Sequence, residues 1–514
     1  MDKEHDNQKK LSGVPVSYWI ASTDDTNYPQ IVSNSDIEVD VAIIGGGITG
    51  LTTAYLLRKE GIRVAIIEAN RIAKGVSGHT TAKITSQHSL IYDKLINKAG
   101  EEKAKQYATA NQKAIELVEK IVSENNIQCD FKRLSAYVYT NENEYIQKLE
   151  NEVKAAIRLG IPAEYTDRLQ LPFNVKGAMK FENQAQFHPR KYLLALAAAI
   201  VGDDCRIFEQ SRAVKFIEGE PHTVITDNGA KIKARSVVLA SHYPFYDLPG
   251  LYFTRIYPER SYLLGVRIKG SFPEGMYITA ENPTRSMRSC PDSDGELLIV
   301  GGEHHKTGHG TDLHNHYEII RQFAQSNFEV LDIPYRWSAQ DYTAMDGIPI
   351  VGHLTSGRNK IYLATGFAKW GMSNGTAAAV IVTDLILKGY SPWALVYDPS
   401  RFTPVASAKK FVKENADVAK NYISGKLNIP TETVNVAKGE AAISETGGHK
   451  VGVYKDMDGN NHFVSTTCTH IGCELKWNSA ELSWDCPCHG SRFTYTGDII
   501  EGPALECIKL LEDL

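Results

Sequence analysis

Two short cysteine–histidine motifs near the C-terminal end constrain this chain more than any other feature. The first runs over 468–473 (CTHIGC), and the second over 486–491 (CPCHGS). One cysteine and one histidine from each motif together make a Cys₂His₂ set. Such a set can hold a [2Fe–2S] cluster, with two thiolates on one iron and two imidazoles on the other. A tetrahedral zinc site is the alternative that these residue types also allow.

The two motifs resemble those of the Rieske family, and that resemblance implies which residues are the ligands. It makes Cys468 and Cys486 the thiolate ligands and His470 and His489 the imidazole ligands. Because neutral imidazoles replace two thiolate charges, such a cluster accepts an electron more readily than a plant-type ferredoxin does. We therefore expect this part of the chain to carry single electrons, and the further matches around the ligands disfavour zinc.

Further residues of the motifs match the electron-transfer branch of that family. In this branch a second cysteine pair forms a disulfide between the cluster loops, which here implies a bond between Cys473 and Cys488. Rieske oxygenases usually lack that pair. Ser491 matches the serine that hydrogen-bonds a cluster sulfur and raises the potential, whereas Phe493 stands where high-potential members carry a tyrosine. The resemblance implies an electron relay with a potential below that of the respiratory members.

A glycine-rich motif near the N-terminus predicts a dinucleotide-binding fold. A predicted strand over 39–44 leads into GGGITG over 45–50, which is followed by a helix and a second strand. In that context Gly45 permits a tight turn, Gly47 lets the backbone approach a pyrophosphate, and Gly50 allows close helix–strand packing. Glu68 ends the second strand, where it can accept hydrogen bonds from an adenosine ribose.

The fingerprint alone does not distinguish FAD from NAD, and a second resemblance decides between them. Residues 41–82 resemble the D-amino-acid oxidase/glycine oxidase superfamily of flavoproteins, including a G-x-S-G loop that contains Ser77. A later glycine-rich helix start resembles the segment with which that family cradles the flavin. In this segment the implied cofactor-binding residues are Gly366, Gly371, Met372, Asn374 and Gly375. The resemblance covers roughly 38–400 and implies bound FAD.

These motifs and the strands between them predict a fold class and a domain order. We expect an α/β Rossmann-like FAD-binding domain with an antiparallel-sheet substrate lobe, followed by a small all-β Rieske domain. The predicted parts are an N-terminal extension (1–37), the oxidoreductase (38–403), a helical linker (404–430) and the Rieske domain (431–514). Within the oxidoreductase, the substrate lobe should comprise about 90–180 and 250–335.

Composition narrows the possible partners and compartments. The chain of 514 residues has a net charge of −5 and no basic tail, so nucleic-acid binding has no electrostatic support. No apolar run approaches the length of a membrane span, and the N-terminus lacks an apolar signal core. The cysteines are concentrated after residue 467, which indicates a metal domain attached to a cytoplasmic body rather than a secreted disulfide framework. We expect a cytoplasmic protein without a membrane span.

The flavoprotein resemblance implies a substrate class and a candidate binding residue. Members of that superfamily oxidise amines or amino acids by hydride transfer to the flavin, and many bind the substrate carboxylate with an arginine, whose planar fork suits it. Arg288 lies where such an arginine often falls. Weaker candidates are Arg285, Arg260 and Tyr262. A surface ion pair is the alternative role for Arg288.

A glycine-rich stretch between His304 and His316 contains five histidines. Imidazole binds zinc, iron and copper well, so a metal site is conceivable. The spacing, however, matches no template of fixed ligands. We expect a histidine-bearing loop, one residue of which could titrate near the flavin and help to take the proton of the substrate.

The two expected cofactors predict a relay within one polypeptide. An amine or amino-acid substrate would give a hydride to FAD, and electrons would pass singly through the [2Fe–2S] cluster to an external acceptor. That acceptor would be a one-electron acceptor protein or a quinone-linked carrier. The arrangement suits a dehydrogenase, because an oxidase returns its electrons to O₂ directly. Two alternatives remain open: a reductase that runs electrons inward from a redox partner, and a redox-sensing protein without catalysis.

Overall fold

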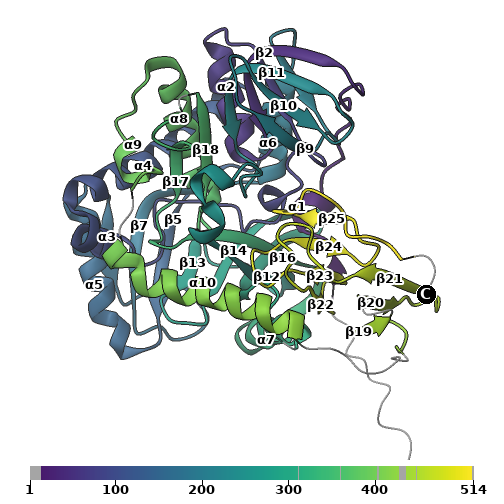
Figure 1. Ribbon diagram of the computed structural model, residues 1–514. Coiled ribbons are helices and arrows are strands. Elements are labelled where there is room, and N and C mark those ends of the chain that lie inside the picture. The colour runs from purple at the N-terminus through teal and green to yellow at the C-terminus, as the bar shows by residue number, and fades with distance from the viewer. Residues whose placement is uncertain are drawn as a thin grey trace, which may run out of the picture.

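The structure is a computed structural model that describes residues 13–310, 312–358, 360–401, 404–427, 436–446 and 449–511 (Figure 1). Its elements form a nucleotide-binding part, a lobe built on a large sheet, a long helix and a small C-terminal β domain. Some residues of each predicted part lie outside the described residues. They are 1–12 of the N-terminal extension; 311, 359 and 402–403 of the oxidoreductase; 428–430 of the linker; and 431–435, 447–448 and 512–514 of the Rieske domain.

The nucleotide-binding part is built on a mainly parallel sheet. Its strands in spatial order are β17 (Ile350–His353), β18 (Ile361–Thr365), β11 (Lys231–Leu239), β2 (Asp36–Ile44), β3 (Val64–Ile67) and β8 (Cys205–Phe208). From β18 to β8 all neighbours are parallel, and β17 adds an antiparallel edge. The hairpin partners β9 (Ala213–Ile217) and β10 (His222–Thr226) extend β11. Each residue of β3 is buried, as expected for a parallel strand covered on both faces.

Helices that follow the two glycine-rich segments pack against each other. These are α2 (Ile48–Lys59) and α8 (Gly371–Lys388), flanked by α4 (Glu101–Glu124) and α6 (Pro189–Ile200). A Cβ at Gly375 would lie 2.8 Å from Ile48 Cγ2 and 2.8 Å from Thr49 Oγ1, so only a glycine permits this approach. The close crossing brings the N-terminal ends of α2 and α8 to the same region of the molecule.

The second lobe is a large, strongly mixed sheet. Its strands in spatial order are β1 (Val14–Pro15), β16 (Val330–Ala344), β12 (Ile256–Ile268), β15 (Gly295–Lys306), β14 (Arg285–Asp292), β13 (Met276–Thr279), β5 (Lys132–Thr140), β7 (Gly177–Gln186) and β4 (Lys83–Ile84), with β6 (Ala163–Thr166) on β7. Most neighbours are antiparallel, as the sequence predicts. The pairs β13–β5 and β1–β16 are parallel. The helices α3 (Tyr92–Ala99), α5 (Asn143–Arg158) and α7 (His314–Asn327) belong to this lobe.

The segment before β2 is integrated into the fold. Its short helix α1 (Tyr18–Ala21) carries Trp19, which is fully buried and donates a hydrogen bond from Nε1 to Thr80 O at 2.7 Å. The Tyr18 hydroxyl donates to Pro291 O at 2.6 Å. This segment therefore fastens the loop around Ser77 to the end of β14.

The C-terminal domain contains two small antiparallel sheets. One comprises β19 (Ala441–Thr446), β20 (His449–Lys455) and β21 (Asn461–Ser465), and the other β22 (Lys476–Asn478), β23 (Ser483–Asp485), β24 (Arg492–Thr494) and β25 (Ile499–Glu501). Trp484 is fully buried within this domain. A Cβ at Gly452 would lie 2.5 Å from the Trp484 ring, so a glycine at 452 lets β20 approach the indole.

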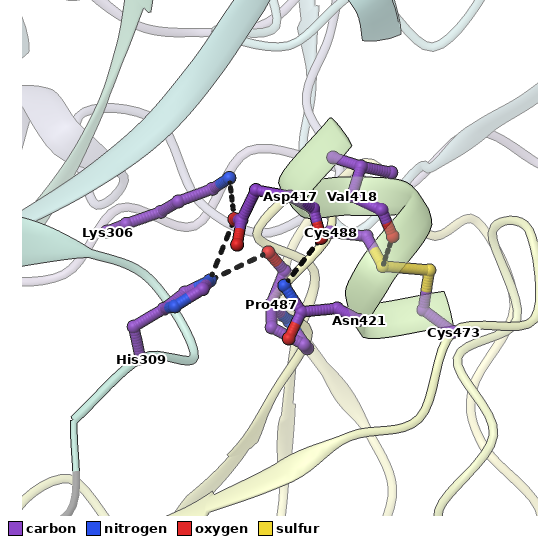
Figure 2. The surroundings of a disulfide bond; sticks show 8 residues. All are labelled: Lys306, His309, Asp417, Val418, Asn421, Cys473, Pro487 and Cys488. Carbon is purple, nitrogen blue, oxygen red and sulfur yellow. Dashed lines mark hydrogen bonds and ion pairs between the residues drawn. A yellow bond between two sulfur atoms is a disulfide. The ribbon is translucent and has the colours of Figure 1, made fainter. Parts of the chain in front are cut away.

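Helix α10 (Pro404–Leu427) crosses the surface of the large lobe and ends beside the C-terminal domain (Figure 1). Ion pairs fasten it to the end of β15: Lys306 Nζ lies 3.0 Å from Glu414. Lys306 also pairs with Asp417 (Figure 2). Asn415 Nδ2 donates to Thr254 O at 3.2 Å. Charged and polar contacts therefore hold the middle of this helix, and Val418 packs against the apolar cluster of the C-terminal domain. Among the helices that the structure describes, none is long and apolar enough to span a bilayer.

Candidate active site and cluster site

A cavity of about 910 Å³ lies where the nucleotide-binding part, the large sheet and the C-terminal domain meet. Several of the predicted cofactor residues line it: Gly45, Gly47, Glu68, Ser77, Gly371 and Met372. The other predicted residues, Gly50, Gly366, Asn374 and Gly375, do not line the cavity. Gly375 instead allows the close crossing of α2 and α8 described above, and it thereby helps to place the starts of these two helices.

The first glycine loop forms a cradle at the start of α2. Gly45 has φ +111°, and a Cβ there would lie 2.5 Å from Ala240 O, so the turn requires a glycine. Gly47 caps α2, and the next amide, Ile48 N, donates to Ser77 Oγ at 3.2 Å. Gly50 packs directly on the Gly45 carbonyl. Backbone amides at a helix start beside open space suit the pyrophosphate of a dinucleotide.

Glu68 lies beside this loop, immediately after β3. Its Oε2 accepts a hydrogen bond from Gly46 N at 2.8 Å, and its Oε1 accepts one from Asn70 N at 2.9 Å. Burial raises the pKa of this carboxyl group, which the two amides partly offset. Because the carboxylate retains further acceptor capacity at the cavity wall, it fits the predicted contact with an adenosine ribose.

An unpaired imidazole lies farther along the same cavity. His242 follows β11, has φ +65° and lines the cavity. Its Nε2 is buried and has no hydrogen-bond partner among the described residues. Buried polar atoms of this kind normally have a partner, which a group bound in the cavity would supply. Together with the glycine cradle and Glu68, this orphaned nitrogen shows that the residues present fit FAD.

Lys369 is a cavity residue that the sequence analysis missed. It precedes α8 and has φ +72°, and its neighbour Ala368 has φ +52°. Burial lowers the pKa of Lys369, while Glu259, at 3.8 Å, and Asp341 oppose that shift. Two successive non-glycine residues in the left-handed region store strain, which is common at functional sites. The sequence feature that could have identified Lys369 as a site residue is its position just before the glycine-rich start of α8.

The four predicted cluster ligands converge in the C-terminal domain. The rings of His470 and His489 lie 5.2 Å apart and nearly perpendicular, and both Nδ1 atoms are buried without a partner among the described residues. A hydrogen bond from the Cys486 thiol lowers the pKa of Cys468. Two adjacent thiols and two orphaned imidazole nitrogens are the donor set of a [2Fe–2S] cluster with mixed ligands, so the residues fit this group.

The predicted disulfide is confirmed, and it lies against α10. Cys473 and Cys488 are bonded, and Cys488 Sγ lies 3.9 Å from Val418 O (Figure 2). The three sulfur atoms of Cys473, Cys486 and Cys488 lie within 4.8 Å of one another. This trio is not a ligand set, because two of its sulfurs are bonded to each other. Ser491 is fully buried, and its Oγ accepts a hydrogen bond from Ala504 N at 3.1 Å; its role in tuning the cluster stays a prediction.

The histidine edge of the cluster site faces the nucleotide-binding part. His470 Nε2 lies 3.8 Å from Asp247 Oδ2, and the His489 ring packs 5.9 Å from the ring of Phe253. The C-terminal domain also supplies part of the cavity wall, through Glu481, Arg492 and residues 499–505. One cavity is therefore shared by the part that fits FAD and the domain that fits the cluster.

Arg288, predicted as a carboxylate clamp, has a different place in the structure. It is 2% exposed, and its Nη1 donates to Ala82 O at 2.8 Å and to Phe187 O at 3.2 Å. Its guanidinium also lies over the Trp19 ring, at 5.2 Å, and it does not line the cavity. The predicted role of Arg288 as a carboxylate clamp is corrected, because its guanidinium already donates to main-chain carbonyls and lies over the Trp19 indole.

The weaker arginine candidates are also engaged, as is Tyr262. Arg285 pairs with Glu303 at 2.6 Å. Arg260 lines the cavity but pairs with Glu481 and Glu501 of the C-terminal domain. Tyr262 is fully buried in a stack of aromatic rings. Arg285 and Tyr262 do not line the cavity. The two carboxylate partners of Arg260 already supply its counter-charge, although its Nε has no hydrogen-bond partner among the described residues.

Lys83 on β4 is a cation at the cavity wall whose partners are neutral. Its Nζ donates to Tyr277 O at 2.9 Å and to Ser286 Oγ at 2.7 Å. No ion pair to Lys83 exists among the described residues. Burial, reinforced by the charge of Arg288, lowers the pKa of Lys83 to about 7. A buried ammonium without a counter-ion favours a ligand that brings a negative charge.

The histidine-rich stretch is divided between two roles. The rings of His305 and His316 stack 4.7 Å apart, and His316 Nδ1 lies 3.2 Å from Glu303 Oε2. His309 lies 3.4 Å from Asp417 of α10, and His304 lines the cavity. Within the described ranges these imidazoles form no cluster suited to a metal ion. The expectation of a histidine-bearing loop is wrong for four of the five residues, because His304 and His305 belong to β15 and His314 and His316 to α7; only His309 lies on the connection between them. The expectation that one of these histidines lies near the flavin site agrees with the place of His304 in the cavity wall.

Comparison with known proteins supports both halves of the site. Residues 40–385 match the family described as FAD dependent oxidoreductase, and residues 429–512 match the Rieske [2Fe-2S] domain. The putative Rieske 2Fe-2S iron-sulfur protein YhfW of Bacillus subtilis (strain 168) is 42% identical over 507 residues, which cover 98% of this chain and 99% of that protein.

Two more distant proteins match the flavoprotein part. Gamma-glutamylputrescine oxidoreductase of Escherichia coli (strain K12) is 23% identical over 398 residues, which cover 72% of this chain and 87% of that protein. The crystal structure of glycine oxidase from Geobacillus kaustophilus matches with a TM-score of 0.55 and 20% identity, covering 71% of this chain and 100% of that chain. The likeness to glycine oxidase is a likeness of fold alone.

Proposed function

Because the chain belongs to the FAD dependent oxidoreductase family and carries a Rieske [2Fe-2S] domain, we propose that it is a dehydrogenase that oxidises an amino acid or a related amine and releases the electrons singly through the cluster. Family membership confirms the predicted fold class and the predicted cofactors, FAD and one [2Fe–2S] cluster. The substrate, the acceptor and the direction of electron flow are the proposed part.

The observation that carries the proposal is the orientation of the cluster site. Both ligand histidines, His470 and His489, turn their rings toward the flavin part, against Asp247 and Phe253. Imidazole ligands raise the potential of such clusters, which makes them suited to accept electrons. Because the imidazole side of the cluster site contacts the flavin part, these contacts support the transfer of electrons from the flavin to the cluster.

The chemistry balances with two single-electron deliveries for each substrate. Oxidation of a CH–NH group to C=N removes a hydride and a proton, and water then hydrolyses the imine to a carbonyl compound and an amine or ammonia. The bound flavin supplies the two-electron acceptor, and the bound cluster supplies the one-electron carrier. Two molecules of a one-electron acceptor, a protein or a quinone-linked carrier, are therefore reduced for each substrate molecule.

Lys83 supports an amino acid as the substrate. We assign to it the carboxylate-binding role that the sequence suggested for Arg288, because Lys83 lines the cavity and has only neutral partners among the described residues. A carboxylate would supply the counter-charge that the buried ammonium lacks. Two of the similar proteins are named for the amino acid glycine and for the amine derivative gamma-glutamylputrescine, which agrees with this class.

An anaerobic substrate screen tests the proposal. The panel comprises D-amino acids, N-methyl amino acids, proline and polyamines, with flavin absorbance and the electron-spin signal of the reduced cluster followed together. We expect an amino acid to bleach the flavin first and the cluster signal to appear afterwards. Ferricyanide should then reoxidise the protein faster than O₂ does. If no compound reduces either centre but a reduced ferredoxin reduces both, electrons run inward and the dehydrogenase proposal fails.

A further inference from the structure

Two side chains of β16 contact the cluster loop directly. The Tyr342 hydroxyl lies 3.0 Å from His489 O and 3.1 Å from Gly502 O, and it donates its hydrogen to these main-chain carbonyls. Gln340 Nε2 donates to Gly490 O at 2.8 Å. His489 is a cluster ligand of the second motif and Gly490 is the next residue. Strand β16 of the flavin part is therefore hydrogen-bonded to the loop that carries the cluster ligand His489.

These two side chains are themselves held in place. Gln340 is buried, and its Oε1 accepts a hydrogen bond from Thr307 Oγ1 at 2.7 Å. Gln340 Nε2 also lies 3.3 Å from the Tyr342 hydroxyl. Gly490 lies close to both strands, because a Cβ there would lie 2.6 Å from Pro258 Cβ and 3.0 Å from Gln340 Nε2. The loop therefore packs directly against β12 and β16 at this residue.

The same side chains border the flavin cavity. Tyr342 and Gln340 both line it, and the His242 ring packs edge-on against Tyr342 with 4.9 Å between ring centres. His242 is the residue whose Nε2 lacks a partner. A single side chain, Tyr342, therefore touches the cavity on one side and the backbone of a cluster ligand on the other.

We propose that Tyr342 and Gln340 are positioning residues that hold the second cluster loop against the flavin cavity, and that they thereby set the rate of electron transfer between the two centres. This inference rests on the proposed function above. In the step concerned, the reduced flavin loses one electron and one ferric ion of the cluster becomes ferrous, and no covalent bond forms or breaks. Neither side chain is oxidised, since each acts through the position of the loop.

Tyr342→Phe tests the inference in the full-length holoprotein. Tyr252→Phe is the matched control, because the Tyr252 hydroxyl is equally buried and donates to Leu354 O at 2.6 Å, entirely within the flavin part. The flavin is reduced without substrate by an anaerobic light pulse in the presence of EDTA, which is oxidised as the electron donor, and reduction of the cluster is followed by absorbance and electron-spin resonance. We expect about fivefold slower transfer in Tyr342→Phe, a factor that one net hydrogen bond can supply. Tyr252→Phe should transfer at the wild-type rate.

Two further readouts separate positioning from other roles. The midpoint potential and spectrum of the cluster should stay unchanged in Tyr342→Phe, while hydrogen exchange at residues 486–491 should increase. A second variant, Gln340→Met, removes the bond to Gly490 and should slow transfer in the same way. Equal transfer rates in Tyr342→Phe, Gln340→Met and wild type would overturn the inference, as would a shifted cluster potential. If reduced wild-type flavin never reduces the cluster, the proposed function itself fails.

Discussion

Arg260 of β12 and Glu501 of the Rieske domain form an ion pair at the cavity wall, with 3.4 Å between Nη1 and Oε2. The arginine is 1% exposed. Glu481 lies 3.6 Å from Arg260, and Arg492 lies 3.2 Å from Glu501. The boundary between the two cofactor domains therefore contains a buried network of charges, which ties docking of the domains to the integrity of the cavity.

Replacing Arg260 with methionine should weaken this docking. Loss of one partner from a buried network costs about 3–5 kcal/mol, and we expect the lower end, about 3 kcal/mol, because Arg492 still neutralises Glu501. Denaturant unfolding, followed by cluster absorbance and flavin fluorescence, measures the loss. Arg158→Met is the control: Arg158 pairs with Glu101 at the surface, where both side chains are about half exposed, and its removal should cost about 1 kcal/mol or less. Equal losses in both variants would contradict the predicted role of the network.

Gly308→Ala should disturb the contact between the large sheet and the cluster loop. Gly308 has φ +72°, and a Cβ there would lie 2.7 Å from both Cα and N of Pro487. Gly389 provides a control, since it has φ +70° but no atom within 4 Å of the same position. Gly389→Ala should therefore cost only the backbone strain, about 1–2 kcal/mol, and Gly308→Ala distinctly more. Thermal unfolding of both variants decides this, and equal shifts in melting temperature would count against the clash.

Binding of anions in the cavity should depend on pH through Lys83. Its pKa is lowered to about 7, so below pH 7 the ammonium is already present and a carboxylate ligand binds at full strength. As pH rises above 7, binding must first protonate Lys83, and the affinity should fall by up to about tenfold for each pH unit. Calorimetric titration with acetate or benzoate between pH 6 and 9 measures this. In Lys83→Met the affinity should be low and independent of pH, and a matching pH slope in that variant would assign the effect to another group.

Removing the disulfide should destabilise the Rieske domain. Cys473 and Cys488 are 15 residues apart in sequence, and closing a loop of this length contributes about 3 kcal/mol. The double variant Cys473→Ser/Cys488→Ser should therefore lose its cluster at lower denaturant concentration than wild type. Loss of flavin from the other part should occur at an unchanged concentration. The control is Cys290→Ser, which replaces a buried free cysteine of the large sheet and breaks no disulfide.

The sequence located the two cofactor motifs because both depend on local spacing. The turn at Gly45, the close packing of Gly50 and the position of Glu68 after β3 follow from one strand–loop–helix unit. The cysteine and histidine ligands are likewise separated by fixed short intervals. Local spacing is retained in the fold, so these predictions needed no knowledge of distant contacts.

The substrate side could not be predicted in the same way, because it depends on contacts between distant segments. Arg288 shares a face of β14 with Ser286, which does line the cavity. The sequence therefore placed Arg288 on the face of β14 that also carries a cavity residue. Trp19 of α1, however, covers its guanidinium, and nothing in the sequence around Arg288 indicates this contact. Tyr342 became significant only when the Rieske domain was seen to lie against β16.

Residues 499–505 stand in the wall of the flavin cavity, so the Rieske domain helps to give that cavity its shape. A solitary flavoprotein of this family must close the corresponding opening with its own chain or leave it to solvent. Here two domains that match different families fix the dimensions of the cavity jointly. Substitutions in β25 and the segment after it, although distant in sequence from the large sheet, should therefore alter the shape of the space beside that sheet.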